Sequence, residues 1–188
     1  MNVLTLLASP RADGNTEAIL SWVEIALRQG GHVIHRIALT NLQIGGCKSC
    51  YACAETEDAP GCVMLDDAQG VFEKMLTADA ILFATPLYMW SYAGQLKPLL
   101  DRTLCMVRKY GTPEHRSFVE GKRTALLVAC GGPVEKNADA IQLAFPRLAD
   151  FLKLDHRGVW IFPNCTEPKT LPNTHGNTAR DLASALTD

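Results

Sequence analysis

The sequence predicts an α/β protein in which helices cover both faces of a parallel β-sheet. Short apolar runs alternate with amphipathic helical patterns along the 188 residues, and continuous apolar runs are typical of parallel strands buried on both faces. Turn-forming residues separate the two kinds of segment, and no internal repeat or low-complexity linker interrupts them. We therefore expect one domain over residues 1–188.

The first half of the chain begins this alternation and then breaks it. Residues 2–8 are an apolar run, residues 16–29 carry an apolar helical face, and residues 32–39 form a second strand-like run. Residues 40–65 break the rhythm and contain four of the seven cysteines. We therefore expect a cysteine-rich insertion at about 45–64 within the domain.

The second half returns to the alternation, with a polar, turn-rich stretch at 108–121. The expected elements are a helix from Asp66 or Asp67 through Leu76, a strand over 80–84, a helix from about Tyr92 to Val107, a strand over 124–129, a helix over 137–153, a strand over 159–162 and a weaker helix from about Asn177 to Leu186. Five strands joined through right-handed crossovers are typical of the order 2-1-3-4-5, so we predict a flavodoxin-like three-layer sandwich.

Ligands of such a sheet bind beyond the carboxyl ends of the strands, where the strand order reverses. The loop over residues 9–16 lies at this edge. It combines the hydroxyls of Ser9 and Thr16, the amide of Asn15 and the guanidinium of Arg11 just before a helix. Free backbone N–H groups and the helix dipole attract anions there, which predicts a phosphate site. An ordinary turn capped by Asn or Thr is the alternative.

Two further loops, 86–94 and 130–136, end strands at the same edge. Large apolar and aromatic side chains in the first favour a flat aromatic ligand or a partner surface. Inward-folded aromatics or a dimer contact are the alternatives. Paired glycines in the second allow close approach to a ligand, although a turn before a helix cap has the same composition. The candidate residues of the two loops are Pro86, Leu87, Tyr88, Met89, Trp90, Ser91, Cys130, Gly131 and Gly132.

Together the three loops fit a flavin mononucleotide (FMN). One suits a phosphate, one suits a ring system, and the third lets its backbone approach a ligand closely. The chain has no GxGxxG fingerprint and no Walker A motif, so a dinucleotide bound in the manner of NAD-dependent dehydrogenases is not expected. Ser9 and Pro10 stand where a low-molecular-weight phosphatase needs a nucleophilic cysteine, which argues against that class.

The cysteine loop is the other unusual feature. Cys47, Cys50 and Cys53 recur at every third position, and eight residues separate the last of them from Cys62. Four such thiolates can bind one [4Fe–4S] cluster, whereas a structural zinc site usually has two separated pairs. Reduced thiols, a disulfide pair or buried cysteines acting as small apolar side chains are the alternatives.

Composition narrows the possible partners. A formal net charge of −2 gives no basic surface for nucleic acid or an anionic membrane. No apolar stretch approaches 18 residues, and the N-terminal residues lack the basic region of a signal peptide. We therefore expect a cytoplasmic protein, in which seven cysteines favour metal or redox work over structural disulfides.

Three ordered segments carry a family resemblance: 9–16 (SPRADGNT), 84–102 (ATPLYMWSYAGQLKPLLDR) and 129–137 (ACGGPVEKN). They resemble the NAD(P)H-dependent FMN reductases of the flavodoxin-like fold, and the cysteine motif resembles the iron-sulfur flavoprotein branch. In that branch the last gap of the motif is typically shorter than the eight residues found here. The resemblance covers roughly residues 1–165.

The resemblance implies FMN, with Ser9, Arg11, Asn15 and Thr16 at the phosphate, residues 86–91 along the isoalloxazine and residues 130–132 near the ring or ribityl chain. It also implies homodimers or homotetramers with the flavin near a subunit interface. NAD(P)H would reduce the flavin, and a quinone, a free flavin, a metal ion or a protein would accept the electrons. We expect no catalytic side-chain acid or base. An electron carrier using FMN and a cluster, or an FMN-dependent biosynthetic dehydrogenase, are the alternatives.

Overall fold

The computed structural model describes residues 1–167 and 170–188. Its strands are β1 (Asn2–Leu7), β2 (Val33–Ala38), β3 (Ala80–Tyr88), β4 (Ser91–Tyr92), β5 (Val107–Arg108), β6 (Arg116–Ser117), β7 (Arg123–Ala129) and β8 (Asp155–Phe162). Its α-helices are α1 (Asn15–Gln29), α2 (Ala68–Thr77), α3 (Lys97–Asp101), α4 (Asp139–Phe151) and α5 (Thr174–Thr187). Short 3-10 helices are η1 (Leu39–Asn41), η2 (Ala52–Glu55) and η3 (Arg102–Met106).

The main sheet has the strand order β2-β1-β3-β7-β8, and all four neighbouring pairs are parallel. Numbered by strand rank, this is the predicted order 2-1-3-4-5, so the flavodoxin-like prediction is confirmed. The central strands read as continuous apolar runs because both of their faces are buried, as in Ala80–Ala84 of β3. The order reverses between β1 and β3, which defines the ligand-binding edge of the sheet.

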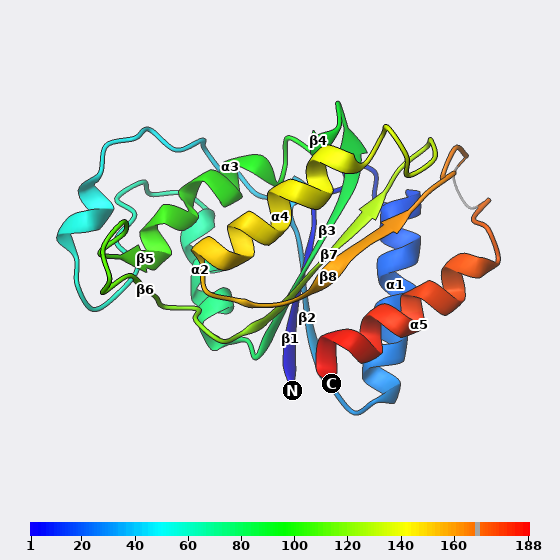
Figure 1. Cartoon of the computed structure of the whole chain (residues 1–188), viewed down its shortest axis with the longest axis horizontal. Helices are drawn as coiled ribbons and strands as arrows, with labels where there is room; N and C mark the ends of the chain where they lie inside the picture. The colour runs from blue at the N-terminus through cyan, green and yellow to red at the C-terminus, as the bar shows by residue number, and fades with distance from the viewer. Residues whose placement is uncertain (168–169) are drawn as a thin grey trace.

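Helices cover both faces of this sheet (Figure 1). On one face α1 and α5 pack against each other and against the sheet, with Ile19 and Leu182 fully buried. On the other face α2, α3 and α4 enclose a larger apolar core that includes Phe83 and Phe145. Among the described residues, no helix has both the length and the apolar character needed to cross a bilayer.

Several element boundaries differ from the expectations. The helix expected over 92–107 is instead β4, a turn, the short helix α3 and the 3-10 helix η3. Pro98 lies in the first turn of α3, where its missing N–H costs nothing, so it marks a start rather than an interior position. The β8 strand begins at Asp155 rather than Val159, and α5 begins at Thr174 rather than Asn177. The polar stretch after η3 contains the small antiparallel pair β5–β6.

The cysteine-rich segment has little regular structure of its own, with η2 as its one helical turn among the described residues. It lies beside α3 and β5, at the left of Figure 1, whereas the β3–β4 hairpin is at the top. The η2 and η3 turns are in contact. The insertion therefore packs against the segment that follows α3.

Candidate functional site

A hollow at the carboxyl edge of the sheet brings the three predicted loops together. Its lining residues are Ser9, Arg11, Gly14, Asn15, Thr16, Pro86, Leu87, Tyr88, Ala129, Gly131 and Cys165. The loops after β1 and β7 contribute to it, and so do the last residues of β3, which runs to Tyr88 rather than ending near Ala84. The topology creates this convergence because adjacent parallel strands end at the same edge.

The polar side chains of the first loop lie at the start of α1, where Ser9 and Asn15 also hold the loop in place. Helix α1 begins after Gly14, which is the N-cap, and no side chain caps the helix. The alternative of an Asn- or Thr-capped turn is therefore wrong. The Ser9 hydroxyl accepts a hydrogen bond from the Arg11 N–H at 3.2 Å and donates one to the Arg11 carbonyl at 3.1 Å, which fixes the turn. The Asn15 amide donates to the Cys165 carbonyl at 3.1 Å.

The second loop is a tight hairpin between β3 and β4. Met89 and Trp90 form its two-residue turn, and both have positive φ (47° and 60°), as in the hairpin turns that usually select Asn and Gly. Their side chains are 85% and 58% exposed. The hairpin thus divides the predicted residues, because Pro86, Leu87 and Tyr88 line the hollow whereas Met89, Trp90 and Ser91 do not.

The third loop contributes its backbone at Gly131. A Cβ atom built there would meet nothing within 4 Å, so this residue faces open space. Cys130 is buried and Gly132 is packed against the Asn137 amide, and neither lines the hollow. Burial raises the pKa of the Cys130 thiol. The helix expected over 137–153 begins at Asp139, and its N-cap is Ala138 rather than Asn137.

Gly14, Ala129 and Cys165 line this hollow without having been predicted, and Cys165 comes from a fourth loop. It follows β8 by three residues, and its N–H donates to the Cys130 carbonyl at 2.9 Å. Burial raises the pKa of its thiol to about 11, with a smaller contribution from Cys130. The rule that selects loops at the carboxyl edge could have identified it, had the loop after the last strand been included.

The four predicted cluster cysteines line a second cavity, together with Cys105 and Arg102. All seven cysteines are free thiols. Cys53 and Cys62 are partly buried, and Cys47 and Cys50 are exposed. Burial raises the pKa of Cys53, and the neighbouring Cys62 raises it further. The disulfide alternative is therefore not what the structure contains.

The lining of this cavity offers four thiols and a turn of backbone N–H groups, which are the donors that an Fe–S cluster uses. Ser49 and Tyr51 have positive φ (50° and 57°) and Cys50 between them does not. Such alternation points successive N–H groups to one side and is found at Fe–S sites. No three metal-ligating side chains among the described residues are arranged to hold one ion, but a cube takes one thiolate per iron and spreads its ligands wider. The Nε–H of buried Arg102 has no hydrogen-bond partner among the described residues, so a donor remains for sulfur.

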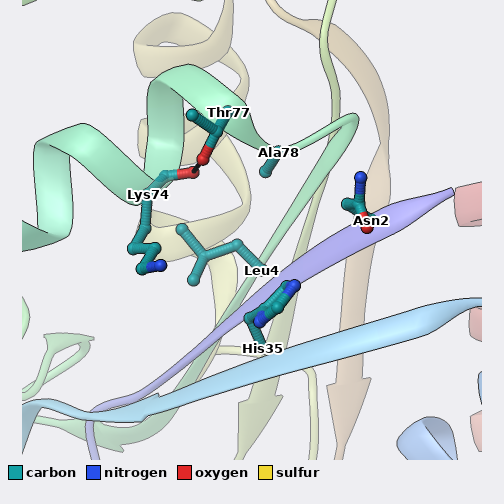
Figure 2. Close-up of a pocket in the computed structure, with 6 residues that line it drawn as sticks. All are labelled: Asn2, Leu4, His35, Lys74, Thr77 and Ala78. Atoms are coloured by element: carbon teal, nitrogen blue, oxygen red, sulfur yellow. Dashed lines mark hydrogen bonds between the residues drawn. The ribbon is translucent and has the colours of Figure 1, made fainter.

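A further hollow lies between β1, β2 and the end of α2 (Figure 2). It is lined by Asn2, Leu4, His35, Lys74, Thr77 and Ala78, and the Thr77 hydroxyl donates to the Lys74 carbonyl at 3.2 Å. None of the predicted site residues lines it. Its position at the start of β1 is away from the strand ends where ligands of this fold gather.

Residues 1–154 match the family described as NADPH-dependent FMN reductase. This match covers most of the chain, so the protein belongs to that family of oxidoreductases.

Among curated relatives, an iron-sulfur flavoprotein of Methanosarcina thermophila is 35% identical over 109 residues, which are 58% of this chain and 56% of the relative. An iron-sulfur flavoprotein of Methanocaldococcus jannaschii is 28% identical over 132 residues, which are 70% of this chain and 62% of the relative. The chain thus matches little more than half the length of these relatives.

Solved structures share the fold at low identity. An NAD(P)H:quinone oxidoreductase from Methanothermobacter marburgensis superposes with a TM-score of 0.75 at 19% identity, covering 100% of this chain and 96% of the other. An FMN-dependent NADH-azoreductase from Bacillus anthracis, solved with FMN, has a TM-score of 0.72 at 14% identity and full coverage of both chains.

Proposed function

We propose that this protein binds FMN and passes electrons from NAD(P)H through it to an acceptor, which can be a quinone, a free flavin, a metal ion or a redox protein. The convergence of the three loops in one hollow at the strand-order reversal carries this proposal. Family membership supports it, as does a relative from Gluconacetobacter diazotrophicus named as an FMN-dependent NADH:quinone oxidoreductase, 39% identical over 67 residues, which are 35% of this chain and 33% of the relative.

In this proposal the first loop holds the phosphate. Arg11 supplies the positive charge, and Ser9, Asn15 and Thr16 supply hydroxyl and amide donors beside the start of α1. Pro86, Leu87 and Tyr88 line the isoalloxazine, with Tyr88 as the aromatic wall. The backbone at residues 130–132 approaches the flavin through Gly131, the residue of the three that reaches the hollow.

Bound FMN would supply hydride acceptance and one-electron transfer, and the protein would supply binding and orientation. The side chains of the hollow offer no general base, because burial keeps the Cys165 thiol protonated with a pKa of about 11. Apolar Pro86 and Leu87 exclude water from one wall of the hollow.

We further propose that Cys47, Cys50, Cys53 and Cys62 hold a [4Fe–4S] cluster. The shared cavity of the four thiols and the names of the iron-sulfur flavoprotein relatives support this assignment. The same cavity favours the second candidate function, an electron carrier that uses FMN and cluster without a substrate of its own.

Titration of the purified apoprotein with FMN, followed by flavin fluorescence, tests the central proposal, and we expect saturable binding. Steady-state oxidation of NADH and NADPH with quinone or ferric acceptors then separates the two functions. Turnover supports the enzyme, whereas FMN binding without turnover on any acceptor supports the carrier. Absence of saturable FMN uptake would contradict both.

We also propose that the protein is a homodimer or homotetramer. Tyr88, Met89 and Trp90 place exposed apolar surface on one hairpin beside the flavin hollow, and exposed patches of this kind mark interaction sites. Light scattering on the eluted protein should give a mass of two or four chains of 20.5 kDa. A monomer at micromolar concentration would contradict this proposal.

A further inference from the structure

The long gap in the cysteine motif poses a physical problem. Eight residues, acidic and polar in composition, separate Cys53 from Cys62. A flexible gap of this length would leave the fourth thiol without a fixed position relative to the other three. The structure contains a brace that addresses this problem, and it comes from outside the motif.

The brace is Arg102, the first residue of η3, whose side chain is almost fully buried. One terminal nitrogen of its guanidinium donates to both carboxylate oxygens of Asp66 at 2.6 Å and to the Gly45 carbonyl at 3.4 Å. The other donates to the Cys62 sulfur at 3.3 Å and to the Met64 carbonyl at 3.4 Å. One side chain therefore joins the two ends of the cysteine loop.

Asp66, the ion-pair partner of Arg102, is itself held by the backbone of the loop ends. Its carboxylate also accepts hydrogen bonds from the Gly45 N–H at 2.9 Å and the Ala68 N–H at 3.1 Å. The Asp66 carboxylate, held by these N–H groups, neutralises the buried guanidinium, since an unpaired buried charge would be costly. The pair lets a positive group remain beside the cysteine sulfurs.

A second buried arginine holds the middle of the gap without touching a sulfur. Arg108 donates to the Thr56 hydroxyl at 2.6 Å and to the Ala59 carbonyl, and it stacks 4.8 Å from the Phe118 ring centre. It also donates to the Cys105 and Val107 carbonyls. The eight-residue gap is thus packed around one arginine, and its cysteine end is fixed by the other.

We propose that Arg102 is a positioning residue for the [4Fe–4S] cluster. Its side chain holds Cys62 in place as the fourth ligand and donates a hydrogen bond to the Cys62 sulfur. The inference rests on the proposed cluster assignment. A positive donor on a ligand sulfur stabilises the more negative, reduced cluster, so it raises the reduction potential. Arg102 would thereby affect both cluster retention and potential.

The test uses the full-length protein, purified anaerobically and reconstituted with iron and sulfide. In Arg102→Met we expect about a tenfold or greater loss of cluster affinity, as is usual when a residue that supports a metal ligand is removed. The cluster that remains should have a lower midpoint potential by spectroelectrochemistry. Arg102→Lys keeps the positive charge but loses the planar, two-nitrogen donor group of the guanidinium. Compared with Arg102→Met, it should restore part of the midpoint potential and a smaller part of the cluster retention.

Arg108→Met is the matched control, because it also removes a buried arginine from the loop but no sulfur contact. The Arg108 charge acts on Cys53 through space, so we expect this variant to lower retention and to shift the midpoint potential of the remaining cluster by much less than Arg102→Met does. FMN affinity depends on a hollow that neither arginine lines, so it reports whether each variant is folded. If the wild type and Arg102→Met have the same midpoint potential while FMN binding is intact, this inference is overturned and the proposed FMN function is not affected.

A measurement on the wild-type protein covers the case in which the variants do not fold. Protein labelled with ¹⁵N only at arginine should show a ¹⁵N hyperfine coupling to the reduced cluster in pulsed EPR, from the Arg102 nitrogen bonded to the ligand sulfur. A reduced cluster without that coupling would overturn the inference. Wild-type protein that retains no iron would overturn the cluster assignment and this inference together. The proposal that the protein binds FMN is tested separately, by the fluorescence titration.

Discussion

The polar residues of the first loop illustrate how a single position can serve a ligand rather than the fold. Ser9 stabilises the turn through its contacts with Arg11, whereas the Arg11 side chain is exposed at the hollow. Removing the Arg11 side chain therefore costs little in folding but removes a cation from the proposed phosphate site. The test of such a residue is its selectivity between ligands with and without a phosphate.

For Arg11→Ala we expect the dissociation constant for FMN to rise about tenfold or more, since a hydrogen bond to a charged group contributes ~1.5–3 kcal/mol. The dissociation constant for riboflavin, which has no phosphate, should not change. Fluorescence titrations with the two flavins measure both values. Equal weakening for both flavins would show that Arg11 does not contact the phosphate. Arg28→Ala, in the last turn of α1 and away from the hollow, is the control.

At the scale of elements, the β3–β4 hairpin combines backbone strain with exposed apolar side chains. Met89 and Trp90 adopt positive φ without being glycine or asparagine, which costs of order 1 kcal/mol or more. Strain of this kind persists where it serves a function, and here it projects two apolar side chains beside the flavin hollow.

The variant Met89→Asn with Trp90→Gly should therefore be more stable than the natural chain, by about 1 kcal/mol, because Asn-Gly suits this turn. Urea unfolding measures the gain, extrapolated to water. The same substitutions remove the exposed patch, so we expect a smaller assembly by light scattering. Unchanged or lower stability would mean that the turn residues are not strained.

The contact between α1 and β2 gives a pH-dependent contribution to stability. Glu17 accepts hydrogen bonds at 2.7 Å from both Arg36 and Ser21. Burial opposes ionisation of Glu17, but the hydrogen bonds from Arg36 and Ser21 outweigh it and lower its pKa below 4.5. The ionised carboxylate therefore stabilises the fold above pH 4.5, and the stabilisation is lost as the pH falls through the lowered value.

Glu17→Gln should lower the free energy of unfolding by ~0.5–1 kcal/mol at neutral pH, as expected for a partly exposed ion pair. The difference from the natural chain should shrink as the pH is lowered below 4.5. Denaturant unfolding at a series of pH values measures it. A difference that is constant across this range would exclude the Glu17 titration as its source.

At the scale of the whole molecule, the central strand β3 joins the two cores. Phe83 is fully buried on the α4 face and packs edge-on against Phe145, with ring centres 5.6 Å apart. Phe83→Ala should destabilise the protein by about 3–5 kcal/mol through lost burial and a residual cavity. Urea unfolding tests this value, and a loss below about 1 kcal/mol would contradict such central packing. Leu143→Ala, at an exposed position of α4, is the control.

Much of this architecture was predictable from the sequence, because the strands are local apolar runs and topology rules limit how they join. The strand order and the meeting of Ser9, Thr16 and Tyr88 at one edge followed from those rules. The helix predicted after β4 failed because its apolar spacing is shared by α3 and a 3-10 turn, which periodicity does not distinguish. Arg102 falls within the helix predicted over 92–107, where the local sequence does not distinguish a buried arginine from an exposed one, yet Arg102 is buried.

By itself, the sequence determined the sheet, its ligand-binding edge and the cysteine motif, since these depend on residue types at short spacings. Only the tertiary structure decided that Arg102 meets Cys62 across 40 residues of chain and that Arg108 meets Thr56 across 52. It also decided that Cys165 joins the proposed flavin site while Met89 and Trp90 do not line it. The physical reason is that burial of a charged or polar side chain depends on which distant segment packs against it, and no local pattern encodes that contact.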